Sequence, residues 1–185
     1  MAITGTNAPS KSSNNGKGYF VNHFTVELVE QQSNQYKDTS IMVKAVDNET
    51  EFVKTFFING NYERDEQNSA VIGWKFPELI NDFFHRIGSK LDVGDNGIIS
   101  DESIDDAKGR EFYGIVYYST GKYKYNCWNQ IASIDEGDEY LADVFEVELG
   151  KGYPRDFKKY GINDSSDTEF NYGANVTSTS SIDNL

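Results

Sequence analysis

The spacing of apolar residues changes along this chain from strand-like alternation to a helical repeat and then back to alternation. Residues 19–31, 39–47 and 52–59 alternate between apolar and polar side chains and are bounded by turn-forming residues, so they predict three strands with one buried face each. The residues expected on the buried face are Phe20, Phe24, Val26 and Leu28 in the first strand and Ile41, Val43 and Ala45 in the second.

A helix is predicted over residues 74–88, where apolar side chains recur at intervals of three and four, with Pro77 in the first turn and Gly88 at the end. Residues 110–119 and 122–132 return to alternation and are joined by a short connection that contains glycine, which is typical of a tight hairpin. Three strands, one helix and two strands is the order of the five-stranded OB-fold, whose helix caps the barrel between strands 3 and 4. We therefore expect a mainly β fold, an OB-fold-like barrel with one capping helix, although other small β-barrels and α+β folds share this order.

The two ends of the chain differ in composition from its middle. Residues 1–18 are rich in Ser, Asn, Gly, Lys and Thr and are expected to form a flexible arm before an OB-fold-like domain over residues 19–150. Residues 151–185 are expected to be a largely disordered acidic tail. Within the domain, residues 92–109 are hydrophilic and predict a long loop, whereas residues 133–150 have enough apolar side chains to pack as a helical turn or an extra strand.

The net charge of -13 comes from 30 acidic and 17 basic residues and, taken alone, argues against binding to nucleic acid. The charge is unevenly distributed. Residues 135–185 hold 12 Asp or Glu and 4 Lys or Arg, a balance of -8, which leaves -5 for residues 1–134. More than half of the excess negative charge therefore belongs to one end of the sequence, and the predicted barrel is free to carry a local basic face.

No pattern of catalytic or metal-binding residues stands out in the sequence. The two histidines, His23 and His85, lie on separate predicted elements without a partner motif, and there is no phosphate-binding loop or zinc-ligand spacing. The acidic residues between Asp92 and Asp106 are too irregularly spaced for a calcium-binding loop. We therefore expect a protein that is not an enzyme and that needs no metal and no cofactor.

The sequence also bears on the cellular compartment. Its single cysteine, Cys127, excludes an internal disulfide and fits a reducing cytoplasm. No stretch approaches the roughly 18 apolar residues of a membrane span, and residues 1–18 lack the apolar segment of a signal peptide. A cytoplasmic protein without a membrane partner is expected.

The best candidate for a binding surface is the second strand of the predicted hairpin. If its alternation is regular, Lys122, Lys124 and Trp128 share one face, and Tyr123 and Tyr125 lie on the other. Lysine and tryptophan on a common face suit a groove that attracts phosphate and offers flat rings to bases, because base stacking on aromatic side chains contributes about 1–3 kcal/mol per base. The alternative is an ordinary barrel with an aromatic core and lysines on its outer wall.

Lysines in the second and third predicted strands, and in the turn before them, add positive charge on the side that OB-folds commonly use for oligonucleotides. Lys54 alternates with Phe52 and Phe56, so all three side chains are expected to point the same way. Either the two phenylalanines lie in an exposed groove, or the register is displaced by one residue. The candidate nucleic-acid-binding residues are Lys37, Lys44, Lys54, Phe56, Arg110, Tyr118, Lys122, Tyr123, Lys124, Tyr125 and Trp128.

A further signal lies in the helix WKFPELINDFFHRIG and the hairpin EFYGIVYYSTGKYKYNCWNQIA that follows it. These two segments resemble those of a family of phage-encoded single-stranded-DNA-binding proteins that is known mostly as a domain of unknown function. In the family, a capping helix leads into Gly-Lys or Gly-Arg, an apolar strand, a short turn with Gly-Lys, and an aromatic strand with Asn. That pattern corresponds here to Gly109-Arg110 through Asn129, within a resemblance that covers about residues 19–132.

This resemblance implies an OB-fold that binds single-stranded DNA without strong sequence preference and supports phage DNA replication or recombination in the cytoplasm of a bacterial host cell. It also implies phage replication or recombination proteins as partners, recruited by an acidic tail with an apolar tip. The corresponding residues here are Ile182, Asp183 and Leu185. The dense run of Asp and the terminal Phe of such tails are missing, so two other roles stay open: competition with DNA for the groove, and solubility.

Two other classes of protein fit the composition. The net charge favours an acidic DNA mimic or inhibitor that occupies the DNA site of a host protein. A virion accessory protein that uses the same barrel as a docking surface is the other alternative. A mimic spreads carboxylates over its folded face, whereas a DNA-binding module is expected to keep many of them in the tail and in residues 92–106.

Overall fold

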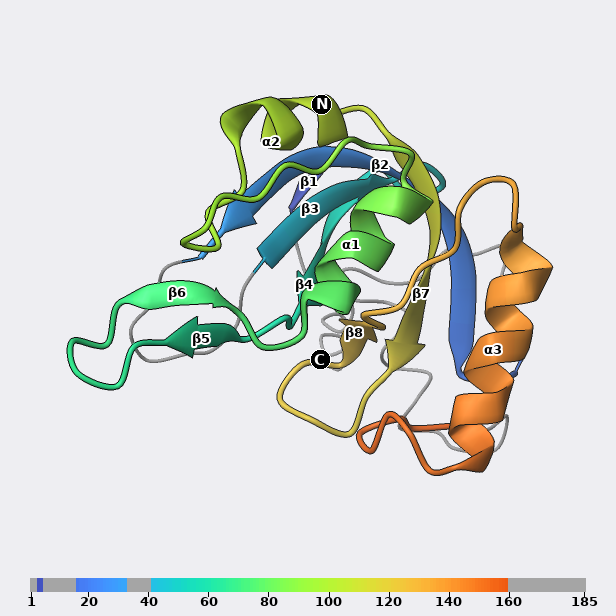
Figure 1. Cartoon of the computed structure of the whole chain (residues 1–185). Helices are drawn as coiled ribbons and strands as arrows, with labels where there is room; N and C mark the ends of the chain where they lie inside the picture. The colour runs from blue at the N-terminus through green and yellow to red at the C-terminus, as the bar shows by residue number, and fades with distance from the viewer. Residues whose placement is uncertain (1–2, 5–15, 33–40, 160–185) are drawn as a thin grey trace, which may run out of the picture.

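The computed structural model describes residues 3–4, 16–32 and 41–159 of the chain. Figure 1 shows a strongly curved sheet with helix α1 packed across its open end and helix α3 running alongside it. In chain order the elements are β1 (Ile3–Thr4), β2 (Tyr19–Gln31), β3 (Ile41–Asp47), β4 (Phe52–Ile58), β5 (Tyr62–Arg64), β6 (Val71–Trp74), α1 (Pro77–Arg86), α2 (Asp101–Ala107), β7 (Glu111–Tyr118), β8 (Tyr125–Cys127) and α3 (Asp138–Gly150).

The long strand β2 holds the sheet together because it pairs with two different neighbours. Its first half pairs with β7, with Tyr19 opposite Tyr117, and its second half pairs with β3, with Gln31 opposite Ile41. The order of the antiparallel strands is β4-β3-β2-β7-β8, and β8 returns beside β4, which nearly closes a five-stranded barrel. The predicted mainly β barrel, with a helix between its third and fourth strands, is confirmed in this form.

Aromatic side chains fill the end of the barrel that α1 covers. The rings of Phe24, Phe56 and Phe112 lie with centroids 5.0 to 5.5 Å apart, and Phe83 of α1 packs on Phe112. Gly114 leaves room for this cluster, because a Cβ atom there would lie 2.9 Å from the Phe56 ring and 3.0 Å from the Phe24 ring. Helix α1 therefore caps the barrel through its apolar face, as its helical repeat predicts.

A β-bulge corrects the predicted face of β2. Phe20, Phe24 and Val26 point into the barrel as expected, but the register shifts between Val26 and Leu28. After the shift Val29 is buried and Leu28 is only half-buried, so the expectation that Leu28 belongs to the core is wrong. An extra residue in one strand reverses the alternation of buried and exposed side chains beyond it, and the apolar pattern does not predict where such a residue falls.

The structure of β4 decides where Lys54 and Phe56 point. Phe56 is fully buried, and Lys54 points the same way, into the barrel, with only 6% of its surface exposed. Burial lowers the pKa of Lys54 to about 8, although the nearby Cys127 and Asp47 act in the opposite direction. The phenylalanines therefore do not line an exposed groove, and the lysine is an interior residue.

Lys54 belongs to a polar layer inside the barrel. Asp47 is fully buried and accepts a hydrogen bond of 2.7 Å from Nδ2 of Asn22 and one of 2.9 Å from the backbone N–H of Glu49. Burial raises the pKa of the Cys127 thiol to about 12, so this thiol stays protonated at neutral pH. The layer places ionisable groups where a core normally holds apolar ones.

Helix α3 covers the outer wall of the barrel at β2 and β7 (Figure 1). Its buried residues Leu141 and Phe145 pack on Tyr19 and Tyr117 from these strands, and Trp128 completes this second apolar cluster. The sequence left a helical turn and an extra strand as alternatives for residues 133–150. The structure selects a helix of 13 residues, which gives the barrel a second core outside its wall.

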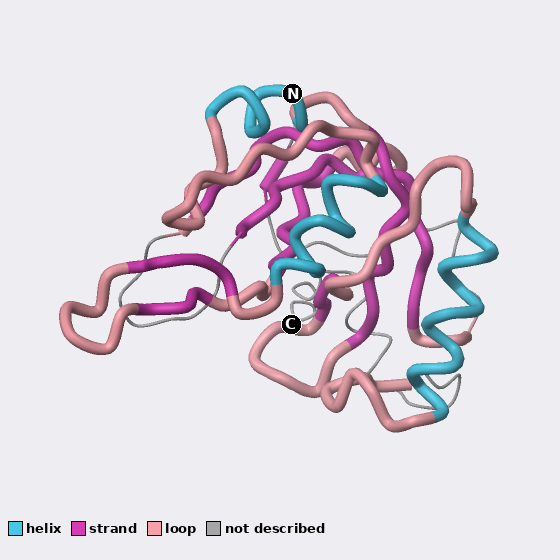
Figure 2. Tube along the Cα trace, in the orientation of Figure 1, coloured by secondary structure: helices cyan, strands magenta, loops and turns pink. Residues whose placement is uncertain are grey.

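Two segments outside the barrel also differ from expectation. The stretch predicted as a long loop contains the helix α2, which begins where the Ser100 hydroxyl accepts a hydrogen bond from the Ser103 backbone N–H. Strands β5 and β6 form a hairpin that extends away from the sheet, as Figure 2 shows. Of the expected N-terminal arm, Ile3 and Thr4 pair in parallel with β4 and residues 1–2 and 5–15 are outside the described part.

Candidate nucleic-acid interface

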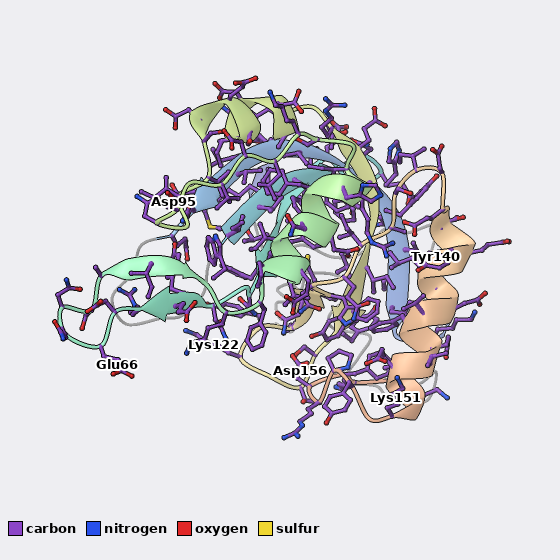
Figure 3. The ribbon with its side chains drawn as sticks, viewed as in Figure 1. Glu66, Asp95, Lys122, Tyr140, Lys151 and Asp156 are labelled. Carbon is purple, nitrogen blue, oxygen red and sulfur yellow. The ribbon has the colours of Figure 1, made fainter. Side chains whose placement is uncertain are left out.

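The loop between β7 and β8, residues 119–124, carries the exposed cations and ring of the predicted hairpin. Lys122, Tyr123 and Lys124 are all exposed, and 57% of the Tyr123 surface is accessible. The Lys122 ammonium lies 5.3 Å from the centre of the Tyr123 ring, within the range of a cation–π contact. Figure 3 shows Lys122 at the same end of the molecule as Asp156 and Lys151.

A second segment lies against this loop. After α3 the chain turns back, and residues 151–159, which we call the return segment, run beside the end of β7. The Thr120 N–H donates to the Asp156 backbone oxygen at 2.8 Å, and the Lys158 N–H donates to the Tyr118 oxygen at 2.8 Å. This part of the expected tail is therefore folded onto the barrel.

The side chain of Asp156 joins the two segments. Its carboxylate accepts hydrogen bonds from the Tyr117 hydroxyl at 2.8 Å, the Ser119 hydroxyl at 2.8 Å and the Asn126 amide at 2.7 Å. Burial alone would raise the pKa of Asp156, but these three hydrogen bonds stabilise the carboxylate and hold the pKa below its ordinary value. For Tyr117, burial and the Asp156 carboxylate raise the pKa of the phenol.

The loop and the return segment form a basic surface on an acidic protein. Together they hold six basic residues and a single acidic one, Asp156, whose carboxylate is turned toward the barrel. The surface can attract phosphate through its cations and offer the Tyr123 ring to a base, which are the two interactions that sequence-tolerant binding to single strands uses. Its basic residues are Lys122, Lys124, Lys151, Arg155, Lys158 and Lys159, of which Lys151 is paired with Glu148 of α3 at 2.8 Å.

Four of the residues predicted on the binding surface are instead buried. Phe56, Tyr118 and Lys54 point into the barrel, and Trp128 is 6% exposed beneath α3. The Trp128 ring lies edge-on to Phe145 with centroids 4.8 Å apart. The expectation that Trp128 shares an open face with Lys122 and Lys124 is therefore wrong, because α3 covers the face that alternation assigned to solvent.

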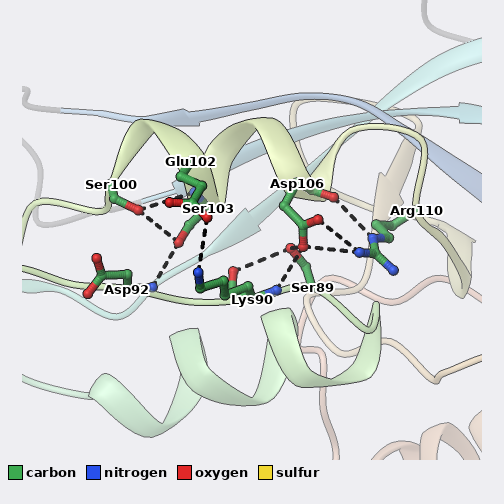
Figure 4. A network of polar contacts seen from close by, with 8 residues as sticks. All are labelled: Ser89, Lys90, Asp92, Ser100, Glu102, Ser103, Asp106 and Arg110. Carbon is green, nitrogen blue, oxygen red and sulfur yellow. Dashed lines mark hydrogen bonds and ion pairs between the residues drawn. The ribbon is translucent and has the colours of Figure 1, made fainter.

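Arg110 lies far along β7 from the loop, at the junction with α2. Its guanidinium donates to both carboxylate oxygens of Asp106, at 2.9 and 3.1 Å, as Figure 4 shows. Asp106 also accepts from the Lys90 N–H and the Ser89 hydroxyl, and these bonds with Arg110 lower its pKa to about 2. Arg110 thus ties β7 to α2 and does not join the basic surface.

The remaining predicted residues are divided between the barrel wall and the ends of the chain. Lys44 is half-buried on the outer face of β3, opposite Thr55, and Tyr125 is half-buried with its ring 5.2 Å from that of Tyr118. Next to Lys44 on this outer face, Phe57 of β4 is 43% exposed, a residue that the sequence did not single out. The predicted residues outside the described part of the chain are Lys37, Ile182, Asp183 and Leu185.

The sequence analysis did not single out Tyr153 and Arg155, which lie on the return segment beside the loop. The signal for them is the basic and aromatic composition of the run KGYPRDFKK, which belongs to the expected tail. The Arg155 guanidinium lies 5.5 Å from the centre of the Tyr153 ring, so the return segment repeats the cation–aromatic pairing of the loop. Proximity to the loop depends on the Asp156 hydrogen bonds, which no local pattern encodes.

Two further observations concern the described residues as a set. No three His, Cys, Asp or Glu side chains within residues 16–32 and 41–159 are grouped so that they could hold a metal ion. In the same residues, no helix has the length and apolar character needed to cross a membrane. No protein-family model matches the chain, and no curated protein matches it either.

Proposed function

We propose that this protein is a non-enzymatic module that binds single-stranded DNA without strong sequence preference, in the service of phage DNA replication or recombination. The observation that carries this proposal is the β7–β8 loop, on which Tyr123 is exposed between two lysines and beneath the ammonium of one of them. Aromatic side chains combined with basic residues are what single-stranded nucleic acid requires of a surface that does not read sequence.

The topology of the barrel supports the proposal. A strand order of β4-β3-β2-β7-β8, with a capping helix between the third and fourth barrel strands, agrees with an OB-fold. OB-folds bind oligonucleotides on their second and third strands and on the loop between their fourth and fifth strands. Here those positions are β3 and β4, with Lys44 and Phe57 facing outward, and the β7–β8 loop.

The acidic composition does not oppose this function, because the loop and the return segment carry one carboxylate between them, Asp156, which is turned toward the barrel. Helix α3 and the turn before it carry seven Asp or Glu between Ile134 and Gly150 without a single Lys or Arg. Binding of phosphate depends on the potential at the contact surface and not on the net charge of the molecule. The protein therefore has a basic end and an acidic flank.

A titration of a fluorescent oligo-dT of about 20 nucleotides with the full chain, followed by anisotropy at about 50 mM salt, tests the proposal. The double charge reversal Lys122→Glu with Lys124→Glu is expected to weaken binding by more than about 10-fold, since two phosphate contacts become repulsive. Lys108→Glu is the matched control, because this exposed lysine lies at the end of α2, away from the loop (Figure 1). Absence of binding by the wild-type chain, or equal affinity of the double variant, contradicts the proposal.

The acidic flank favours one second candidate, a DNA mimic that binds a basic host protein. Exposed carboxylates follow α3 at Asp138, Glu139, Asp143 and Glu146. The same titration separates the two functions, because a mimic has no affinity for oligonucleotides at any salt concentration.

A further inference from the structure

The return segment presents a second cation–aromatic pair to solvent. Tyr153 is 46% exposed, Arg155 is exposed, and the guanidinium lies over the ring. Like Lys122 and Tyr123 of the loop, the pair combines a cation with a tyrosine ring, at a cation-to-centroid distance of 5.5 Å here and 5.3 Å in the loop. Neither Tyr123 nor Tyr153 belongs to an apolar core cluster of the described residues.

The two pairs are close to each other because of the hydrogen bonds of Asp156. Thr120 is two residues from Lys122, and Arg155 is the neighbour of Asp156, whose backbone oxygen accepts the Thr120 N–H. The distance from Lys122 to Arg155 is at most the sum of three parts: two residues along the loop, the gap between the hydrogen-bonded backbones, and one residue along the return segment. Together these parts place the two Cα atoms within about 16 Å of each other. That span is covered by a few nucleotides of one strand.

We propose that the return segment is a second contact for single-stranded DNA, with Tyr153 and Arg155 binding beside the loop, and that Asp156 is the positioning residue that holds it there. This inference rests on the proposed function of the loop. Asp156 contributes no cation and no ring of its own. It turns its carboxylate toward Tyr117, Ser119 and Asn126, so the outer side of the segment is left basic.

The first test removes the second contact itself. The double substitution Tyr153→Ala with Arg155→Ala is expected to weaken binding of the labelled oligo-dT by about 5- to 100-fold, the range for the loss of one stacked base. The slope of log K against log salt concentration is expected to become shallower by the contribution of about one phosphate contact, because Arg155 no longer displaces a counterion. A change in packing alone does not alter this slope.

The second test addresses Asp156 through the sign of its effect. Asp156→Asn removes a negative charge, so a purely electrostatic effect would strengthen binding to DNA. If Asp156 positions the return segment, the variant instead binds oligo-dT several-fold more weakly, and the backbone amides of Thr120 and Lys158 exchange with solvent at least about 10-fold faster. Glu139→Gln is the matched control, since it removes one exposed carboxylate from the far end of α3 and is expected to leave both measurements unchanged.

The outcomes separate this inference from the function of the loop. If the loop variant at Lys122 and Lys124 loses affinity while the Tyr153 and Arg155 variant keeps both wild-type affinity and wild-type salt dependence, the inference is wrong and the function stands. If neither Asp156→Asn nor Asp156→Ala accelerates amide exchange, or if exchange accelerates without loss of affinity, the positioning role is wrong. A wild-type chain that binds no oligonucleotide overturns the proposed function and this inference together.

Discussion

Trp128 and Tyr123 lie five residues apart in the same hairpin and have opposite environments. Trp128 is packed between the barrel and Phe145 of α3, whereas Tyr123 stands on the loop with more than half of its surface exposed. The chain has one other tryptophan, Trp74, and it is buried as well. Among these aromatic residues the tryptophans serve the core, and the tyrosine is the residue available to a ligand.

This difference predicts opposite effects of two alanine substitutions. Trp128→Ala is expected to lower the free energy of unfolding by about 3–5 kcal/mol, because it leaves a cavity under α3. Tyr123→Ala is expected to change it by less than about 0.5 kcal/mol while weakening binding of oligo-dT. Urea denaturation and the anisotropy titration measure the two effects. Tryptophan emission that responds strongly to oligo-dT would contradict the buried environments of both tryptophans.

Lys54 is an ammonium-bearing residue inside the barrel, with a pKa lowered by burial to about 8. Because the folded pKa lies below the ordinary value of 10.5, the unfolded chain binds more protons between these two pH values, and stability rises with pH across that window. We expect the free energy of unfolding of the wild type to rise relative to that of Lys54→Met by on the order of 2–3 kcal/mol between about pH 7.5 and 10.5.

Denaturation by urea at the two pH values checks this prediction. Lys44→Met is the matched control, since it removes a lysine from the outer face of the neighbouring strand. A constant difference between wild type and Lys54→Met across the window would mean that Lys54 does not change its charge there.

At the scale of elements, the alternation of side chains identifies strands well and their exact faces less well. The bulge in β2 moves Val29 into the core and Leu28 out of it. A bulge is set by the pairing of two strands, so the sequence of one strand cannot reveal where it falls.

This correction predicts an asymmetry between adjacent residues. Val29→Ala is expected to destabilise the protein by about 1–3 kcal/mol, since it removes buried methyl groups, whereas Leu28→Ala costs less even though it removes a larger side chain. Thermal or urea unfolding of the two variants measures the difference. If Leu28→Ala destabilises the protein more than Val29→Ala, β2 has no bulge and its register is regular.

The five barrel strands and the helix between the third and fourth were predictable because each has a periodicity of its own. Lys122, Tyr123 and Lys124 were found for a related reason, since a short polar turn between two strands is exposed by default. Two features depend on contacts between distant segments and were missed: the cover that α3 provides for Trp128, and the attachment of the return segment through Asp156. The ion pair of Arg110 with Asp106 joins residues only four apart, but it depends on where α2 ends, and α2 was not predicted.

At the scale of the whole molecule, the charge is polarised. The basic surface formed by the loop and the return segment stands out on a protein of net charge -13, and α3 beside it is acidic. We expect a polyanion to be attracted to the basic surface and repelled by α3. Binding is therefore expected to be oriented and to depend steeply on salt.

The expected salt dependence follows from the number of phosphate contacts. With three to four contacts on a single strand, raising the salt from about 50 to 200 mM is expected to weaken binding by about 20- to 50-fold. Anisotropy titrations at four salt concentrations give the slope. A slope near zero would mean that the basic surface does not meet the phosphates.

The enclosed thiol of Cys127 has a practical consequence. It is the only sulfhydryl in the chain, it is half-buried against the barrel core, and burial keeps it protonated at neutral pH, so it is expected to react slowly with maleimide reagents in the native protein. A cysteine introduced at the exposed position Glu139, in the first turn of α3, is then expected to be modified much faster than Cys127. A dye placed there would report rotation and distance without touching the loop or the return segment.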